Sequence, residues 1–174
     1  MGLMRKLMMG CISDGVKTLV NTTEPHPSPV WMKTPITLTV GASYSVSWTG
    51  AMPTTGDFIY PFKIYGGDVV VSDMCNIRLN KETSTIHILV TLFDKKVVNI
   101  GMNLSGTATL ELRFTITGAT ENNDSFTVYT IDTEFYVNGN VMGRASGIKN
   151  KKNVGDGLEY YENIAGTFVI KKLS

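Results

Sequence analysis

Residues 108–137 read ATLELRFTITGATENNDSFTVYTIDTEFYV, and this stretch decides the fold class. In its first half, apolar residues alternate with polar ones: one face holds Leu110, Leu112, Phe114 and Ile116, and the other holds Glu111, Arg113, Thr115 and Thr117. A period of two predicts a half-buried strand. Residues 126–137 are rich in Thr, Val, Tyr, Phe and Ile, which favour strands. The polar segment 118–125 suits a hairpin connection, so the stretch predicts a long antiparallel hairpin at the centre of an all-β domain.

The rest of the chain repeats the strand pattern in shorter segments. Further strands are predicted at residues 16–20, 36–40, 43–49, 58–65, 68–72, 76–79, 85–92, 97–100 and 167–173. Pro61 makes its strand an edge strand or a bulged one. The very apolar segment 85–92 predicts a central strand. Because about ten short strands occur and no helical period follows residue 15, the sequence predicts an antiparallel β-sandwich or jelly roll.

Glycine marks two connections near the C-terminal half of the chain. Asn138-Gly139 stands between apolar residues and predicts a type I′ hairpin turn. Residues 143–157 contain four glycines and the basic run at 149–152, and this composition predicts a loop.

Prolines separate the predicted domain from the residues before it. Pro25, Pro27, Pro29 and Pro35 hold the backbone near polyproline II and remove donors that a sheet would need. We therefore predict an arm and linker at residues 1–34 and a β-sandwich domain at residues 35–174. The apolar exceptions in the linker are Val30, Trp31 and Met32, which we expect to anchor the arm through protein contacts.

Composition narrows the function classes. The chain has 174 residues, 43% of them hydrophobic and 18% charged, with a formal net charge of +1. This hydrophobic content argues against disorder, and the charge balance gives no reason to expect nucleic acid or an anionic membrane as partner. No segment approaches the roughly 20 apolar residues of a membrane span. The four-residue apolar run before Cys11 is shorter than the core of a signal peptide, so we expect no secretion signal.

No arrangement of residues predicts a metal or a nucleophile. His26 and His87 are scattered, as are Cys11 and Cys75, so they lack the spacing of a zinc site. The two cysteines allow one disulfide at most, and their pairing stays open. The chain has no GxSxG motif. Residues 122–124 (NND) lack the spacing of a calcium loop. We therefore expect no metal, no cofactor and no catalytic residue.

Carboxylates and basic residues allow two further interpretations. Paired carboxylates can hydrolyse glycosides, and the candidates are Glu111, Asp132, Glu134, Glu159 and Glu162. Asp132 and Glu134 share one face of a predicted strand, a pattern more typical of a solvated face. Arg144 and the basic run at 149–152 could meet phosphate, but no aromatic residues are interleaved with them. A solvated loop is the simpler interpretation.

Aromatic residues carry the alternative hypothesis. The first group comprises Trp31, Trp48, Phe58, Tyr60, Phe62 and Tyr65, and Tyr160 and Tyr161 precede the last strand. Exposed rings on a β-sandwich can stack on sugars, whereas buried rings only pack the core. A carbohydrate- or receptor-binding module with a glycan partner is therefore the alternative, and it requires exposed Tyr or Trp side chains.

The chain as a whole resembles bacteriophage virion accessory proteins of the capsid-decoration, head-fibre or tail-adaptor type. The resemblance rests on the low-charge β domain rich in Thr, Asn and Gly, the arm TTEPHPSPVWMKTP (22–35), the turn YVNGNV (136–141) and the end AGTFVIKKLS (165–174). It implies a β-sandwich or jelly roll, docking by an extended arm, and homo-oligomers, often trimers. It transfers no functional residue.

We therefore expect a non-enzymatic virion structural protein, assembled in the host cytoplasm, that contacts its own copies and other virion proteins.

Overall fold

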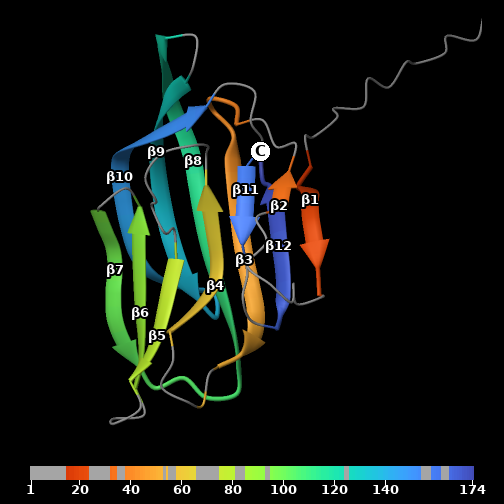
Figure 1. The fold of residues 1–174 in the computed structure, drawn as a ribbon, viewed down its shortest axis with the longest axis vertical. Coiled ribbons are helices and arrows are strands. Elements are labelled where there is room, and N and C mark those ends of the chain that lie inside the picture. The colour runs from red at the N-terminus through yellow and green to blue at the C-terminus, as the bar shows by residue number, and fades with distance from the viewer. Residues whose placement is uncertain are drawn as a thin grey trace, which may run out of the picture.

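A computed structural model of the chain describes residues 15–23, 32–34, 38–52, 54, 58–65, 75–80, 85–92, 95–123, 126–153, 158–161 and 165–174. Throughout these ranges the regular elements are strands, and every strand pair is antiparallel. The strands form two six-stranded sheets that lie face to face (Figure 1). The predicted all-β sandwich is thus confirmed.

The long hairpin lies in the first sheet, sheet A. In spatial order, sheet A consists of β1 (Lys17–Thr22), β12 (Thr167–Lys172), β3 (Ser43–Ala51), β8 (Thr107–Asn123), β9 (Phe126–Val137) and β10 (Asn140–Asn153). Sheet B consists of β2 (Met32–Thr34), β11 (Leu158–Tyr161), β4 (Phe58–Tyr65), β5 (Cys75–Asn80), β6 (Thr85–Leu92) and β7 (Lys95–Met102). Strand β6 pairs on both sides, as its apolar sequence predicts.

The core fills the space between the sheets with alternate residues of the central strands. Sheet A contributes Tyr44, Val46, Trp48, Leu110, Leu112, Phe114, Ile116, Ile131, Phe135, Val137, Phe168 and Ile170, and sheet B contributes Ile86, Ile88, Val90 and Val98. The rings of Tyr44 and Phe114 stack with their centroids 5.4 Å apart. Each large apolar side chain buried in this way stabilises the fold by about 1.5–3 kcal/mol.

The hairpin β8–β9 is longer than the sequence predicts. Residues 118–123, predicted as part of a loop, continue β8 and pair with β9 as far as Asn123 and Phe126. The pairing satisfies backbone donors and acceptors that a polar loop would leave to water. Strand β3 stops pairing at Thr115, whereas β8, β9 and β10 continue together beyond it (Figure 1).

Strand β10 corrects a second prediction. Residues 143–153 were predicted as a loop because of their glycines and lysines, but they form an edge strand of sheet A. The register of β10 against β9 shifts between Val141 and Gly143 and again between Ala145 and Ile148. Gly147 has a φ of +67°. Met142 is the extra residue at the first shift, whereas Gly147 lies in the second bulge, where its positive φ favours a residue without a Cβ.

The N-terminal segment contributes an edge strand to each sheet. Strand β1 pairs with β12 in sheet A, and β2 pairs with β11 in sheet B. Both strands lie before residue 35, where the sequence analysis placed the start of the domain. Strand β1 confirms the strand predicted at residues 16–20. Strand β2 was not predicted, because it depends on backbone hydrogen bonds to β11, which the periodicity of apolar residues does not indicate.

Two shorter predictions have mixed outcomes. Of the strand predicted at 36–40, the structure describes residues 38–40, which form no strand and lead into a turn at Gly41, whose φ is +86°. Pro61 interrupts the register of β4 against β5 between Ile59 and Phe62. The bulge is therefore confirmed, whereas an edge position is wrong, because β4 lies between β11 and β5. The strand predicted at 68–72 lies outside the described residues.

The type I′ turn is confirmed at Asn138 and Gly139, whose φ angles are 49° and 80°. The amide of Asn138 donates to the carbonyl of Thr109 at 2.8 Å, and its side-chain Oδ1 accepts from the Thr109 amide at 2.8 Å. This turn therefore joins β9 to β10 and also holds the start of β8.

We expect Asn138→Ala to lower the free energy of unfolding by about 1–2 kcal/mol, since alanine is strained at a positive φ and lacks the acceptor. Asn138→Gly loses only the acceptor and should cost about half as much. Urea unfolding followed by circular dichroism measures both variants. Equal stability of the alanine variant and the wild type would contradict this role of Asn138.

Candidate functional site

The outward face of sheet A carries polar side chains on neighbouring strands. Hydroxyl groups pair across β3 and β8: Ser43 with Thr115 at 2.8 Å, and Thr49 with Thr109 at 2.9 Å. Between these pairs, the Ser45 hydroxyl donates to the Glu111 carboxylate at 2.7 Å. The alternation of the sequence produces this face, because in a strand the residues next to a core residue point away from the core.

Charged residues extend these contacts toward β10. The Arg113 guanidinium donates to both oxygens of Glu111, at 2.8 and 3.0 Å, and lies 4.3 Å from the centroid of the Tyr136 ring. The Tyr136 hydroxyl donates to Glu134, which also accepts a hydrogen bond from Arg144. We call Ser45, Glu111, Arg113, Tyr136, Glu134 and Arg144 the polar network. It connects four adjacent strands, β3, β8, β9 and β10.

The polar network keeps its two glutamates ionised. Burial by itself would raise the pKa of Glu111, but hydrogen bonds from Arg113 and Ser45 outweigh it and hold the pKa below its ordinary value of 4.5. Hydrogen bonds from Arg144 and Tyr136 lower the pKa of Glu134. The bond to Glu134 raises the pKa of Tyr136 above 10.0. A general acid of a glycosidase needs a raised carboxyl pKa, so neither glutamate has that property.

The lowered pKa of Glu111 predicts a loss of stability in acid. A carboxyl whose pKa is lower in the folded state stabilises the protein above its unfolded pKa, and this stabilisation disappears as pH falls through the folded pKa. We expect Glu111→Gln to be less stable than the wild type at pH 7 and to approach its stability below the ordinary value of 4.5. Urea unfolding at pH 7 and at pH values below 4.5 measures the difference. The same difference at every pH would contradict the role of the carboxylate.

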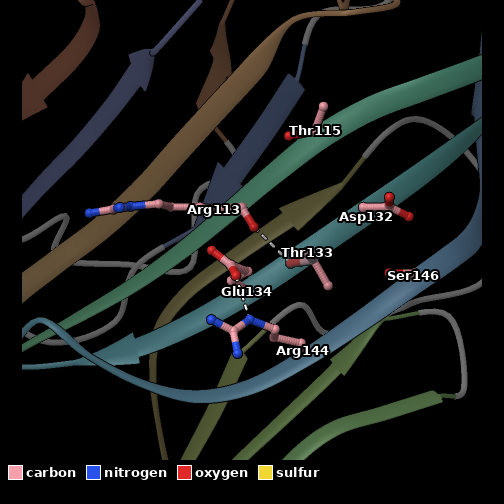
Figure 2. Close-up of a pocket in the computed structure, with 7 residues that line it drawn as sticks. All are labelled: Arg113, Thr115, Asp132, Thr133, Glu134, Arg144 and Ser146. Carbon is pink, nitrogen blue, oxygen red and sulfur yellow. Dashed lines mark hydrogen bonds and ion pairs between the residues drawn. The ribbon is translucent and has the colours of Figure 1, made fainter.

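A polar pocket of about 290 Å³ opens on this face beside the polar network (Figure 2). The polar pocket is lined by residues of β8, β9 and β10: Arg113, Thr115, Asp132, Thr133, Glu134, Arg144 and Ser146. Asp132 and Glu134 lie on the same face of β9, as the alternation predicts. The sequence did not predict that Arg113 and Arg144 flank them, because this proximity depends on the register between strands.

The bulge in β10 shapes the polar pocket. Ser146 and Gly147 together stand opposite the single residue Asp132, because the register shifts between Ala145 and Ile148. The Gly147 amide, which the bulge removes from the ladder, donates to Oδ1 of Asp132 at 2.8 Å. One carboxylate oxygen thus holds the bulge in place, and Asp132 is fixed at the edge of the pocket.

Of the residues predicted to anchor the arm, only Met32 is among the described residues, and it does not line the polar pocket. Val30 and Trp31 lie outside the described residues. Met32 is the first residue of β2, where its backbone pairs with Tyr160 of β11. The arm-contact role of Val30, Trp31 and Met32 remains a prediction.

Other candidate residues lie apart from the pocket or outside the described residues. His87 is half-buried in β6, and Cys75 begins β5. His26, Cys11 and Asp124 lie outside the described residues, and so does any Cys11–Cys75 bond. Lys149 is part of β10, where its ammonium donates to the Thr130 hydroxyl at 2.6 Å. Glu159 is in β11, opposite Lys33 and Tyr65. Glu162 lies outside the described residues.

The described aromatic side chains do not form an exposed platform. Those of Tyr44, Trp48, Phe114, Phe135 and Phe168 are buried in the core. Tyr129 is half-buried against the core, and Tyr136 is 9% exposed with Arg113 over its ring. The side chains of the other aromatic residues that suggested sugar stacking lie outside the description. Stacking on a ring therefore receives no support from the described rings.

No protein-family model matches this chain, and no curated protein matches it. Among the described residues, no three His, Cys, Asp or Glu side chains are grouped so that they could hold a metal ion. The same residues include no helix with the length and apolar character needed to cross a membrane.

Proposed function

We propose that this protein is a non-enzymatic structural protein of a virion and acts through protein–protein contacts and oligomerisation. The observation that carries the proposal is the course of the N-terminal segment, which adds β1 to sheet A and β2 to sheet B. Strand addition uses backbone hydrogen bonds, so the same sheet edges suit a strand from another chain. The resemblance to virion accessory proteins supplies the virion setting.

The edge of sheet A opposite β1 is formed by β10, and its features disfavour pairing with a strand of another chain. Strand β10 is long and lies at an edge, but two bulges interrupt its register and its sequence carries three lysines within residues 149–152. Bulges and lysines on an edge strand prevent uncontrolled pairing with other sheets. Contacts between chains would then be directed to the edges where β1 and β2 lie.

The polar network supports a stable scaffold. Glu111 and Glu134 are held by arginines, and their pKa values are lowered. Carboxylates used in this way fix neighbouring strands to one another and do not serve as proton donors at neutral pH. This arrangement favours a structural role for the outward face of sheet A.

The test is the native mass of the full-length chain, measured by light scattering after gel filtration. We expect a trimer or larger assembly. A chain that starts at Lys33 should lose subunits, because it lacks β1, and circular dichroism checks that it remains folded. The triple variant V30A/W31A/M32A tests the predicted anchors without removing a strand.

To test the virion setting, particles are purified by density-gradient banding from lysates of the cells in which this protein is made. Peptides of this chain should band with the particles in mass spectrometry. A monomeric full-length chain that is also absent from the particles would overturn the proposed function.

A further inference from the structure

Several groups at the polar pocket have no partner within the described part of the chain. Asp132 uses Oδ1 to hold Gly147 and leaves Oδ2 open. Arg144 donates from Nε to Glu134, and its two terminal nitrogens make no further hydrogen bond to the described residues. The Ser146 hydroxyl likewise has no bond among them. The open groups are thus one anionic acceptor, the donors of a guanidinium, and a hydroxyl that does both.

The other side chains that line the polar pocket already make hydrogen bonds, and the Arg113 guanidinium points toward Glu111 and away from Asp132 and Ser146 (Figure 2). Both oxygens of Glu134 accept hydrogen bonds, one from Tyr136 and one from Arg144. The Thr115 hydroxyl pairs with Ser43, and the Thr133 hydroxyl donates to the carbonyl of Arg113. The open groups therefore belong to Asp132, Arg144 and Ser146, and they come from the two strands β9 and β10 (Figure 2).

The charge of the polar pocket is balanced. Two arginines and two carboxylates line it. Arg144 is paired with Glu134 of the lining, whereas Arg113 is paired with Glu111, which lies beside the pocket. An anion would meet carboxylates beside each guanidinium, and a cation would meet the guanidinium groups. A neutral ligand with hydroxyl groups suits this balance, because each hydroxyl can both donate and accept.

We propose that the polar pocket binds one neutral sugar residue through its hydroxyl groups. One hydroxyl of the sugar donates to Oδ2 of Asp132, which lies beside Ser146 (Figure 2), and another hydroxyl accepts from the Arg144 guanidinium. Hydrogen bonds to charged groups are the strong ones in such a site. The volume of about 290 Å³ lies at the lower end of the range for small-molecule sites, so it limits the ligand to about one sugar residue.

The open, polar character of the pocket predicts that it binds a sugar weakly. Arg113 covers the ring of Tyr136, so no described ring stacks on the sugar, and Arg144 is 67% exposed. Hydrogen bonds in an open pocket compete with water. We expect dissociation constants in the millimolar range, on the order of 1–10 mM. Such a site gains strength when several copies of the chain act together on one surface.

Titration of the ¹⁵N-labelled full-length chain with methyl hexosides tests the proposal. Methyl glucoside, galactoside and mannoside are added up to about 100 mM, well above the expected dissociation constant. For at least one of them, the amides of Asp132, Arg144, Ser146 and Gly147 should shift and saturate. Glucuronate and glucosamine, which carry a charge, should bind more weakly than the matching neutral sugar.

Three variants make the test specific. Asp132→Asn keeps a carbonyl oxygen for the Gly147 amide but places a donor where the open acceptor was, so affinity should fall at least about fivefold. Arg144→Gln should weaken binding by a similar factor. Lys149→Gln removes a positive charge from the same strand outside the polar pocket, and its affinity should stay within about twofold of the wild type.

The outcomes separate the sources of the sugar. Tighter binding of the assembled protein to immobilised glycans that end in the same residue identifies a surface glycan, and equal binding identifies the free sugar.

No saturating shift with any methyl hexoside overturns the proposal, as does equal affinity in the wild type and the Asp132→Asn variant. The native mass tests the proposed function separately, so either proposal can fail without the other.

Discussion

Replacing Gly166 with alanine is expected to lower the free energy of unfolding by more than about 3 kcal/mol, at or beyond the usual cost of overpacking a core. A Cβ at this position would lie 2.2 Å from Nε1 of Trp48 and 2.7 Å from the carbonyl oxygen of Thr49. The indole is fully buried, and the strand backbone beside it is held by pairing with β12. Neither neighbour can move away without breaking other contacts.

Gly50 has the same constraint against the same indole. Its Cβ would lie 2.2 Å from Cζ2 of Trp48 and 2.8 Å from the carbonyl oxygen of Ala165. We expect Gly50→Ala to be destabilised about as strongly as Gly166→Ala. The two glycines therefore form the space that the largest fully buried side chain occupies.

Urea unfolding by circular dichroism measures both variants, and Gly118→Ala is the matched control. A Cβ at Gly118 would be 3.6 Å from the Thr130 hydroxyl, an ordinary contact, so its stability should stay within about 0.5 kcal/mol of the wild type. In a Trp48→Leu background the cost of Gly166→Ala should shrink, because the indole is gone. An undiminished cost there would contradict the role of the indole.

Phe135→Ala is the second substitution with a large expected effect. Phe135 is fully buried on β9 and stands opposite Leu112 of β8 in the middle of sheet A. Removal of a buried phenyl ring costs about 3–5 kcal/mol from lost burial and the cavity that remains. Since small domains are stable by about 5–15 kcal/mol, this change should leave a large fraction of the protein unfolded on mild warming.

Thermal and urea unfolding measure the effect, with Val141→Ala as the control. Val141 lies in the paired strand β10 but is 38% exposed, so its truncation should change the stability by about 0.5 kcal/mol or less. A cost below about 1 kcal/mol for Phe135→Ala would show that this part of the core is not packed as described.

The amino-acid sequence by itself determined the fold class and the local elements with strong periodicity. The alternation from Leu110 to Ile116 placed β8 and its buried face, and Asn138-Gly139 specified the type I′ turn. The strand predicted at residues 167–173 is β12, Thr167–Lys172. These features depend on neighbours in the chain, since the strand period and the turn conformation are set by the residues themselves.

Only the tertiary structure decided the features that depend on pairing between distant strands. Gly143 and Gly147 predicted a loop, yet β9 provides a partner: Gly143 pairs with Phe135, and Gly147 lies in a bulge. In the same way, residues 32–34, where no strand was predicted, form β2 because β11 provides a partner.

The candidate site belongs to this second class. Arg113, Asp132 and Arg144 come from three strands, and their proximity follows from the register of β8 and β10 against β9. Alternation predicts which way a side chain points, but a shift of one residue changes which side chains face one another across strands. The polar face was therefore determined by the sequence pattern, whereas the polar pocket exists only because the strands pair in this register.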